Sequence, residues 1–136
     1  MEYQYVLFGD PIPLARARYT GRRVWDSQKE IKLVSALNLK QQHGKRRLLF
    51  GPLHFDVTFY MKMPEDPRKR KKYDGNYHFF RPDIDNMVKM LLDVAGNNVL
   101  YRNDCIVCSI NARKIYDETP RTEIKIREMN NEKPST

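Results

Sequence analysis

The chain has 136 residues, which is enough for one compact domain with a buried core and too few for two. Hydrophobic residues make up 40% of the sequence, so disorder throughout the chain is not expected. Lys and Arg number 25 against 17 Asp and Glu, which gives a net charge of +8. The composition therefore fits either a nucleic-acid-binding protein or an ordinary soluble basic protein.

Nothing in the sequence predicts secretion or a membrane span. Residues 1–8 lack the basic region and long apolar run of a secretory signal, and no apolar run approaches the roughly 20 residues that span a bilayer. Cys105 and Cys108 are too few for a disulfide framework, and no second Cys or His pair completes a zinc site with them. We therefore expect a cytoplasmic protein.

The first part of the chain predicts a strand and a basic arm. Polar and apolar residues alternate over residues 2–8, and the prolines after Gly9 end this strand. Residues 14–23 follow as an irregular arm whose arginines either bind phosphates through bidentate hydrogen bonds or lie in a solvated loop. These candidate DNA-binding residues are Arg16, Arg18, Arg22 and Arg23.

A helix and the clearest strand come next. Ser27 and Glu30 have the spacing of a capping box, and apolar residues then recur at helical intervals, so we predict a helix over 28–42. The apolar residues are Ile31, Leu33, Val34 and Leu37. Alternation then predicts a strand over 53–61, which places on one face Leu53, Phe55, Val57, Phe59 and Met61.

Residues 65–80 predict a long polar connection with a run of five basic residues. Like charges repel each other, so this run is not expected to form a buried element. It is either a loop that contacts a phosphate backbone or a charged run that faces water. The basic residues are Arg68, Lys69, Arg70, Lys71 and Lys72. Aromatic residues follow that either stack on exposed bases or hold the loop to the core, namely Tyr73, Tyr77, Phe79 and Phe80.

The remaining elements complete a prediction of an α+β fold. A helix over about 83–95 ends at Gly-Asn-Asn, and strands follow over 105–115 and 122–128. We expect a single small domain over 1–128 with a mixed sheet of about four strands and two main helices. Residues 129–136 are expected to be a flexible tail.

Carboxylates gather where an extended segment becomes the second helix. Asp83 and Asp85 are two residues apart at this junction, and such a pair can converge on one cation, for which Mg²⁺ or Mn²⁺ suits hard oxygen ligands. Asp104, at the head of the next strand, is a candidate third ligand, and Lys89 is a candidate to stabilise transition-state charge. The alternative is an ordinary ladder of helix ion pairs, because Asp85, Lys89 and Asp93 are spaced i, i+4, i+8.

The segment Arg-Pro-Asp-Ile-Asp-Asn-Met-Val-Lys at 81–89, followed by Tyr-Arg-Asn-Asp at 101–104, resembles the RusA family of Holliday-junction resolvases. The resemblance implies that Asp83, Asp85 and Asp104 are metal-binding catalytic carboxylates. It also implies that Lys89 is the catalytic lysine. Many relatives have a second acid in place of the Asn that precedes Asp104, but this Asp keeps the spacing of the motif.

Asp93 matches a recurrent family residue to which we give a supporting role, and Arg81 is a further candidate for phosphate binding. The resemblance implies a small α/β homodimer that introduces paired nicks across a four-way DNA junction, in recombination and repair in a bacterium or phage. Two alternatives stay open: a nuclease of relaxed specificity that cuts flaps or duplexes, and a branched-DNA-binding module without catalysis.

Overall fold

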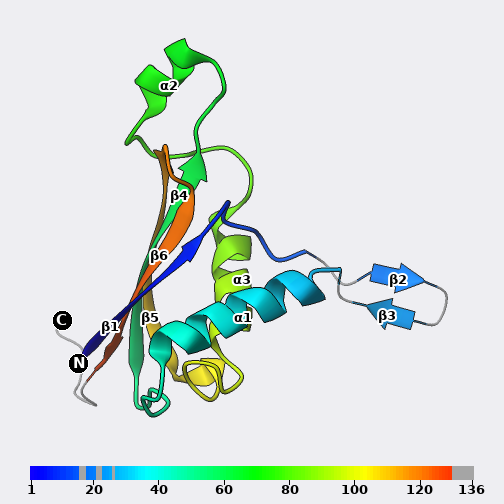
Figure 1. Ribbon diagram of the computed structural model, residues 1–136, viewed down its shortest axis with the longest axis vertical. Helices are drawn as coiled ribbons and strands as arrows, with labels where there is room; N and C mark the ends of the chain where they lie inside the picture. The colour runs from blue at the N-terminus through cyan, green and yellow to red at the C-terminus, as the bar shows by residue number, and fades with distance from the viewer. Residues whose placement is uncertain (16–17, 21–22, 26, 130–136) are drawn as a thin grey trace.

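A computed structural model describes residues 1–15, 18–20, 23–25 and 27–129 (Figure 1). Its centre is a four-stranded sheet in the order β1-β6-β4-β5. The strands are β1 (Glu2–Phe8), β4 (Leu53–Lys62), β5 (Val107–Asp117) and β6 (Arg121–Glu128). Strand β6 pairs antiparallel with both neighbours, whereas β4 and β5 run parallel, so the sheet is mixed. The predicted α+β class and single small domain are confirmed.

One face of the sheet carries the core. On β4 every second side chain is buried, with an exposed fraction of at most 6%, and these are Leu53, Phe55, Val57, Phe59 and Met61. Because side chains of a strand alternate between the two faces, this pattern requires cover on one face only. Ile124 and Ile126 extend the same buried face onto β6.

Two helices cover that face. Helix α1 (Lys29–His43) and helix α3 (Ile84–Ala95) lie on the same side of the sheet (Figure 1). Met87, Leu91 and Val94 of α3 are buried at helical spacing, so one stripe of the helix packs on the strands. The helices predicted over 28–42 and 83–95 are thus confirmed within one or two residues.

The side of α1 that packs on the rest of the protein is not the side that carries its apolar stripe. Ile31, Val34 and Leu37 are 43%, 66% and 58% exposed, whereas the buried residues of the helix are Leu39 and His43. Periodicity correctly predicts the helix, but it does not say against what the apolar stripe packs. This stripe therefore lies on the outside of the monomer.

Ser27 does not cap α1, contrary to the capping-box prediction. The helix begins one residue later than that motif requires, with Gln28 at the N-cap and without a side-chain capping bond. The Gln28 amide instead donates to the carbonyl of Pro13 at 2.9 Å and accepts from the Ala15 N–H at 2.9 Å. The Gln28 side chain therefore holds the backbone of residues 13–15, where the basic arm begins.

The basic run forms a short helix, which the sequence did not predict. Helix α2 (Pro67–Tyr73) begins where the Asp66 carboxylate accepts a hydrogen bond from the Arg68 N–H at 2.9 Å, with a proline in the first turn. No residue of α2 is buried, so its side-chain charges stay solvated. The expectation that the run is not a buried element therefore holds, although the run is helical.

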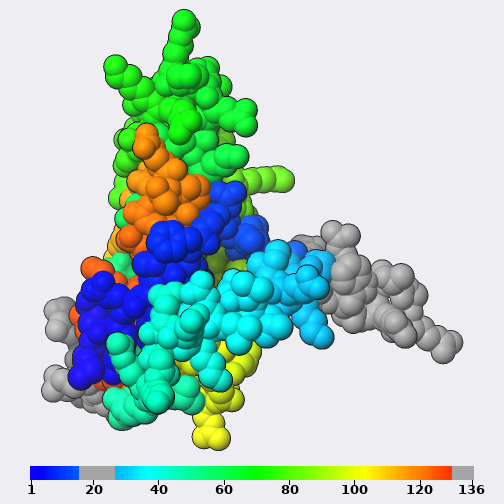
Figure 2. All heavy atoms as spheres, in the orientation of Figure 1, coloured from blue at the N-terminus to red at the C-terminus, as the bar shows by residue number. Residues whose placement is uncertain are grey.

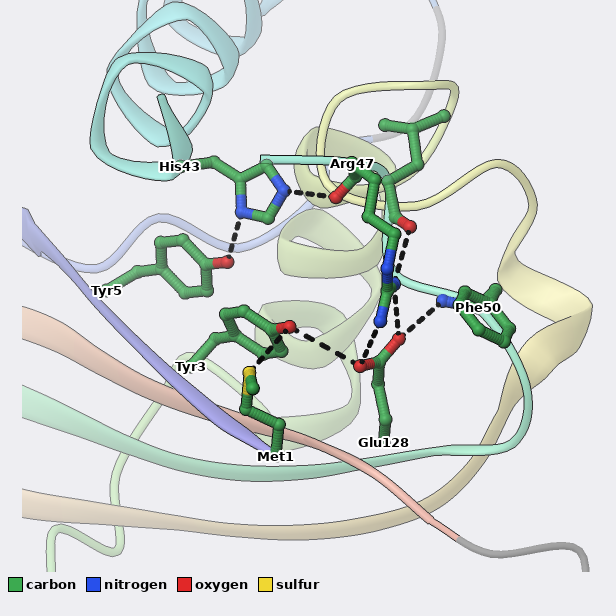
Figure 3. Close-up of polar contacts among 8 residues, drawn as sticks. Met1, Tyr3, Tyr5, His43, Arg47, Phe50 and Glu128 are labelled. Carbon is green, nitrogen blue, oxygen red and sulfur yellow. Dashed lines mark hydrogen bonds and ion pairs between the residues drawn. The ribbon is translucent and has the colours of Figure 1, made fainter. Parts of the chain in front are cut away.

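A group of polar contacts lies around Tyr5, His43 and Glu128 (Figure 3). His43 of α1 lies 2.7 Å from the Tyr5 hydroxyl and 2.8 Å from the carbonyl oxygen of Arg47. Burial raises the pKa of Tyr5 to about 12, so its hydroxyl stays protonated. Arg47 forms a bidentate pair with Glu128, at 2.8 and 3.1 Å, and Glu128 also accepts from the Phe50 N–H at 3.0 Å. These bonds join β1, α1 and β6.

The smaller elements complete the described chain. Strands β2 (Arg18–Thr20) and β3 (Arg23–Trp25) form an antiparallel hairpin before α1. The short 3₁₀ helix η1 (Asp104–Ile106) precedes β5, so that strand begins two residues later than predicted. Most of the predicted tail, 130–136, lies outside the described residues. No helix among the residues described is long and apolar enough to cross a bilayer.

Candidate active site at the start of α3

The two carboxylates of the Asp-x-Asp motif lie at the N-terminus of α3. Asp83 has an extended backbone and is the N-cap residue, and Asp85 lies in the first helical turn. The positive end of the helix dipole favours both negative charges. The first residue of the basic arm contacts the same turn, because the Leu14 N–H donates to the Asn86 carbonyl at 2.9 Å. The predicted junction between extended chain and helix is therefore present.

Neither carboxylate has a strong structural partner among the described residues. Asp83 makes no side-chain capping bond to the helix, although it occupies the cap position. Asp85 lies 3.9 Å from the Lys89 ammonium, and the two side chains are 65% and 61% exposed. An exposed i, i+4 pair of this kind contributes about 0.5 kcal/mol or less to stability. Helix capping and ion pairing therefore account for little stabilisation by Asp83 and Asp85.

Asp83 and Asp85 line an open cleft of about 790 Å³ between the start of α3 and β5. The remaining lining residues are mostly aromatic or basic, with two aliphatic residues among them, and are Tyr77, His78, Phe79, Phe80, Arg81, Ile84, Ala112, Arg113 and Lys114. Arg113 is paired with Asp56 of β4 at 3.0 Å. The cleft thus combines two carboxylates with cationic and aromatic walls, which suits a ligand that carries both phosphate and bases.

Lys114 is a site residue that the sequence interpretation missed. Its ammonium donates 2.6 Å hydrogen bonds to the backbone carbonyls of Phe80 and Pro82. Burial lowers the pKa of Lys114, and the nearby charge of Asp83 opposes that shift. A lysine inside a predicted strand gives no signal of this role in the sequence. Only the fold places β5 beside the segment that leads into α3.

Asp104 is held at the other end of α3. Its carboxylate accepts a 2.9 Å hydrogen bond from the hydroxyl of the fully buried Tyr101. Burial raises the pKa of Tyr101, so the hydroxyl remains a donor. Gly96, which follows the last residue of α3, has no room for a β-carbon because that atom would collide with the Asp104 carboxylate. Tyr101 and Gly96 are two further residues to which the sequence interpretation gave no role at the site.

The three predicted ligands therefore do not meet within one chain. Asp83 is the N-cap of the 12-residue helix α3 and Asp85 lies in its first turn, whereas Asp104 lies beside its C-terminal end. A helix of that length spans about 18 Å. Among the residues that the structure describes, no group of three or more His, Cys, Asp or Glu side chains is placed to hold a metal ion. One chain thus brings two of the three carboxylates together.

Lys89 and Asp93 lie on the exposed side of α3. Lys89 follows Asp85 by one helical turn and projects from the same face. Asp93 forms a 2.8 Å ion pair with Lys32 of α1. The described contacts therefore connect Asp93 to the packing of two helices, and include no pair between Asp93 and Lys89.

The candidate phosphate-binding residues lie in three places. Arg68 to Lys72 occupy α2, which stands beyond the end of β4 (Figure 1), and Arg81 lines the cleft. Arg18 and Arg23 begin the strands of the β2–β3 hairpin. Arg16 and Arg22 lie outside the described residues.

Comparison with known proteins identifies the family. A family model described as endodeoxyribonuclease RusA matches residues 9–127. The chain is 32% identical to the uncharacterised protein YqaN of Bacillus subtilis, over 93% of this chain and 96% of that protein. It is also 35% identical to the crossover junction endodeoxyribonuclease rusA of Lactococcus phage r1t, over 57% of this chain and 56% of the phage protein. The chain therefore belongs to the RusA family of endodeoxyribonucleases.

Proposed function

We propose that this protein is a divalent-metal-dependent endonuclease that resolves four-way DNA junctions by paired, symmetric nicks, acting as a homodimer. The observation that carries the proposal is a pair of carboxylates, Asp83 and Asp85, in a basic and aromatic cleft. Asp83 makes no capping bond, and Asp85 has only an exposed ion pair with Lys89. Membership of the RusA family, and the name of the phage relative, support the reaction and the junction substrate.

The two carboxylates fit a hard divalent cation. Mg²⁺ is commonly held by one or two carboxylates together with waters and substrate phosphate, and Mn²⁺ accepts the same ligands. Both acids are exposed in the open cleft, so phosphate can reach a cation held there. When bound, the metal supplies an activated water and neutralises charge on the phosphate.

Protein groups around the carboxylates have separate tasks in this proposal. Lys89, one turn along α3 from Asp85, stabilises negative charge on the phosphate in the transition state. Arg81 is in the cleft wall, where a guanidinium can bind a neighbouring phosphate through two hydrogen bonds. Lys114 holds the backbone that carries Asp83 and is a positioning residue.

The separation of the acids along α3 supports an enzyme of two chains. Asp104 lies about 18 Å from the motif acids by helix length, so it does not reach their metal from within the same chain. We propose that the partner copy places its Asp104 at the site. A four-way junction cut at two equivalent strands also calls for a two-fold enzyme.

The exposed stripe of α1 offers a surface for that association. Ile31, Val34 and Leu37 lie in the open, and Leu33 adds a fourth exposed apolar side chain. Figure 2 shows α1, in cyan, along the front of the molecule below β1. Burial of this stripe between two copies removes its apolar side chains from water.

Cleavage of a synthetic four-way junction tests the proposal. Wild type, Asp83→Asn and Glu118→Gln are compared in Mg²⁺, Mn²⁺ and EDTA. Glu118 is an exposed acid in the turn between β5 and β6 and serves as the control for loss of one charge. We expect paired nicks from wild type and Glu118→Gln in metal, and none in EDTA or from Asp83→Asn.

Matched substrates separate the two alternatives. Equal rates on junction, flap and linear duplex would favour a nuclease of relaxed specificity. Tight junction binding without nicks in either metal would favour a binding module without catalysis, and would leave the carboxylates without a catalytic role.

A further inference from the structure

Three aromatic side chains stand in the open beside the proposed catalytic carboxylates. Tyr77, Phe79 and Phe80 are 71%, 74% and 55% exposed. The rings of Phe79 and Phe80 are stacked, with centroids 4.8 Å apart and an angle of 22° between the planes. Phenylalanine is usually buried, and a contiguous exposed aromatic patch on a folded chain indicates a binding surface.

The backbone under these rings is fixed by β5. The Gly75 N–H donates to the Tyr116 carbonyl at 3.1 Å, and the His78 N–H donates to the Lys114 carbonyl at 3.0 Å. Lys114 then holds the carbonyl of Phe80 itself. The rings are thus presented on a segment paired to the free edge of the sheet, which lowers the entropy lost when a ligand binds.

The surroundings of the patch fit a nucleotide. All three aromatic residues line the cleft that contains Asp83 and Asp85. Cationic side chains in the same cleft suit phosphates, and the aromatic faces suit bases, because every base has a π-face. In a continuous duplex both faces of a base are covered by its neighbours, so such a patch has no base to bind.

We propose that Phe79 and Phe80, with Tyr77 beside them, form a stacking platform for a DNA base that is unstacked at a branch point. The inference rests on the proposed function and deepens it, because it gives the cleft a means to distinguish branched DNA from duplex. An unpaired or poorly stacked base enters such a platform at the lowest cost. The platform binds and positions DNA and takes no part in the chemistry.

A fluorescent base reports directly on this contact. The probe is a four-way junction with 2-aminopurine at the branch point, titrated in EDTA so that metal-dependent cleavage does not occur. We expect stacking on the platform to change the fluorescence with wild type. We expect no such change with Phe79→Ala/Phe80→Ala, and a junction Kd at least about tenfold weaker, with duplex binding unchanged.

Two further variants separate stacking from other effects. Phe79→Leu keeps an apolar side chain but lacks the aromatic face, so we expect it to lose the fluorescence change while it keeps the wild-type melting temperature. Phe50→Ala removes an exposed phenylalanine from the loop between α1 and β4 and is expected to behave as wild type.

The outcomes that overturn the platform are distinct. Unchanged junction binding and fluorescence in Phe79→Ala/Phe80→Ala would exclude it, and equal weakening for junction and duplex would indicate a contact with backbone instead. Conversion of a wild-type dimer to monomer by the same variant would assign the patch to an interface between copies. Junction nicking by wild type without a fluorescence change overturns only the platform, whereas a fluorescence change without nicking in metal overturns only the proposed endonuclease.

Discussion

The ammonium group of Lys114 donates a 2.6 Å hydrogen bond to the carbonyl oxygen of Pro82, the residue that precedes Asp83. A second bond of the same length reaches the Phe80 carbonyl. One side chain of β5 thus fixes the last residues before α3 and the direction from which Asp83 enters the cleft. These two carbonyl acceptors also satisfy hydrogen-bond donors of the partly buried Lys114 ammonium.

Lys114→Met is therefore expected to reduce junction cleavage by about 10- to 100-fold, the effect typical of residues that orient metal ligands. The Mg²⁺ concentration for half-maximal activity should rise, because Asp83 is less well placed. Lys114→Arg should restore part of the activity. Lys125→Met, at an exposed position of β6, is the control for loss of a lysine. An unchanged Mg²⁺ requirement in Lys114→Met would show that the lysine does not position Asp83.

The pair between Arg47 and Glu128 predicts how stability depends on pH. The Arg47 hydrogen bond holds the pKa of the Glu128 carboxyl below its ordinary 4.5. A carboxyl with a lowered folded-state pKa stabilises the protein fully above the unfolded-state pKa, and this contribution is lost as pH falls through the folded-state pKa. Glu128→Gln should therefore lose less stability on acidification below about pH 4.5 than wild type does.

Urea unfolding of both proteins across that range measures the effect. Glu118→Gln, which removes an exposed carboxylate from the turn between β5 and β6, should keep the wild-type pH dependence. Parallel stability curves for wild type and Glu128→Gln would show that the pair does not contribute in this way.

The sequence predicts the type of each main element, but not what the apolar side of each helix packs against. Apolar residues occupy every second position of β4 from Leu53 to Met61. Only a strand places all of these side chains on one covered face. The apolar stripe of α1 also predicts a helix, yet Val34 faces outward because the helix packs with other residues. Periodicity fixes the element type, whereas the partner of a stripe depends on tertiary or quaternary contacts.

The sequence names candidate site residues, but it does not give their geometry. Asp83 and Asp85 are close together in the sequence and remain so in space. Asp104 follows later in the sequence, after the whole of α3, and lies beside the C-terminal end of that helix. Sequence spacing alone does not predict this position. Lys114 reaches the site only through the parallel pairing of β4 and β5, which short-range patterns do not encode.

Helix α2 should contribute charge to DNA binding without contributing to the core. Alanine at all five positions from 68 to 72 is expected to weaken junction binding and to reduce the slope of log K against log salt by about 0.9 for each phosphate that the variant no longer neutralises. The melting temperature should change little, because no residue of α2 is buried. An alanine pair at Lys125 and Arg127 of β6 measures the effect per charge removed elsewhere, with which the effect per charge of α2 is compared. An unchanged slope would show that α2 is a helix that only faces water.

The exposed stripe of α1 should hold the dimer. Val34→Glu places a charge in the middle of the stripe and should lower self-association, since a buried unpaired carboxylate is costly. Sedimentation velocity of wild type and variant measures this directly. Gln41→Glu adds the same charge at an exposed polar position of α1 and should leave the dimer intact. A dimeric Val34→Glu protein would place the interface elsewhere.

Mixed dimers test whether the site is shared between chains. Asp83→Asn and Asp104→Asn homodimers are each expected to be inactive. If the site combines Asp83 of one chain with Asp104 of its partner, a dimer of one Asp83→Asn chain and one Asp104→Asn chain contains one site with both changes and one intact site. Co-expression of the two variants should therefore restore nicking.

The restored activity should also have a particular form. With one intact site for each mixed dimer, single nicks in a junction should dominate over paired nicks, and co-expressed protein should reach at most half the wild-type rate. If each chain instead built its own site, both sites of the mixed dimer would carry one defect and no activity would return. Mixtures of Asp83→Asn with Asp85→Asn provide the matched control, because those two residues lie at the same helix end and should not complement each other.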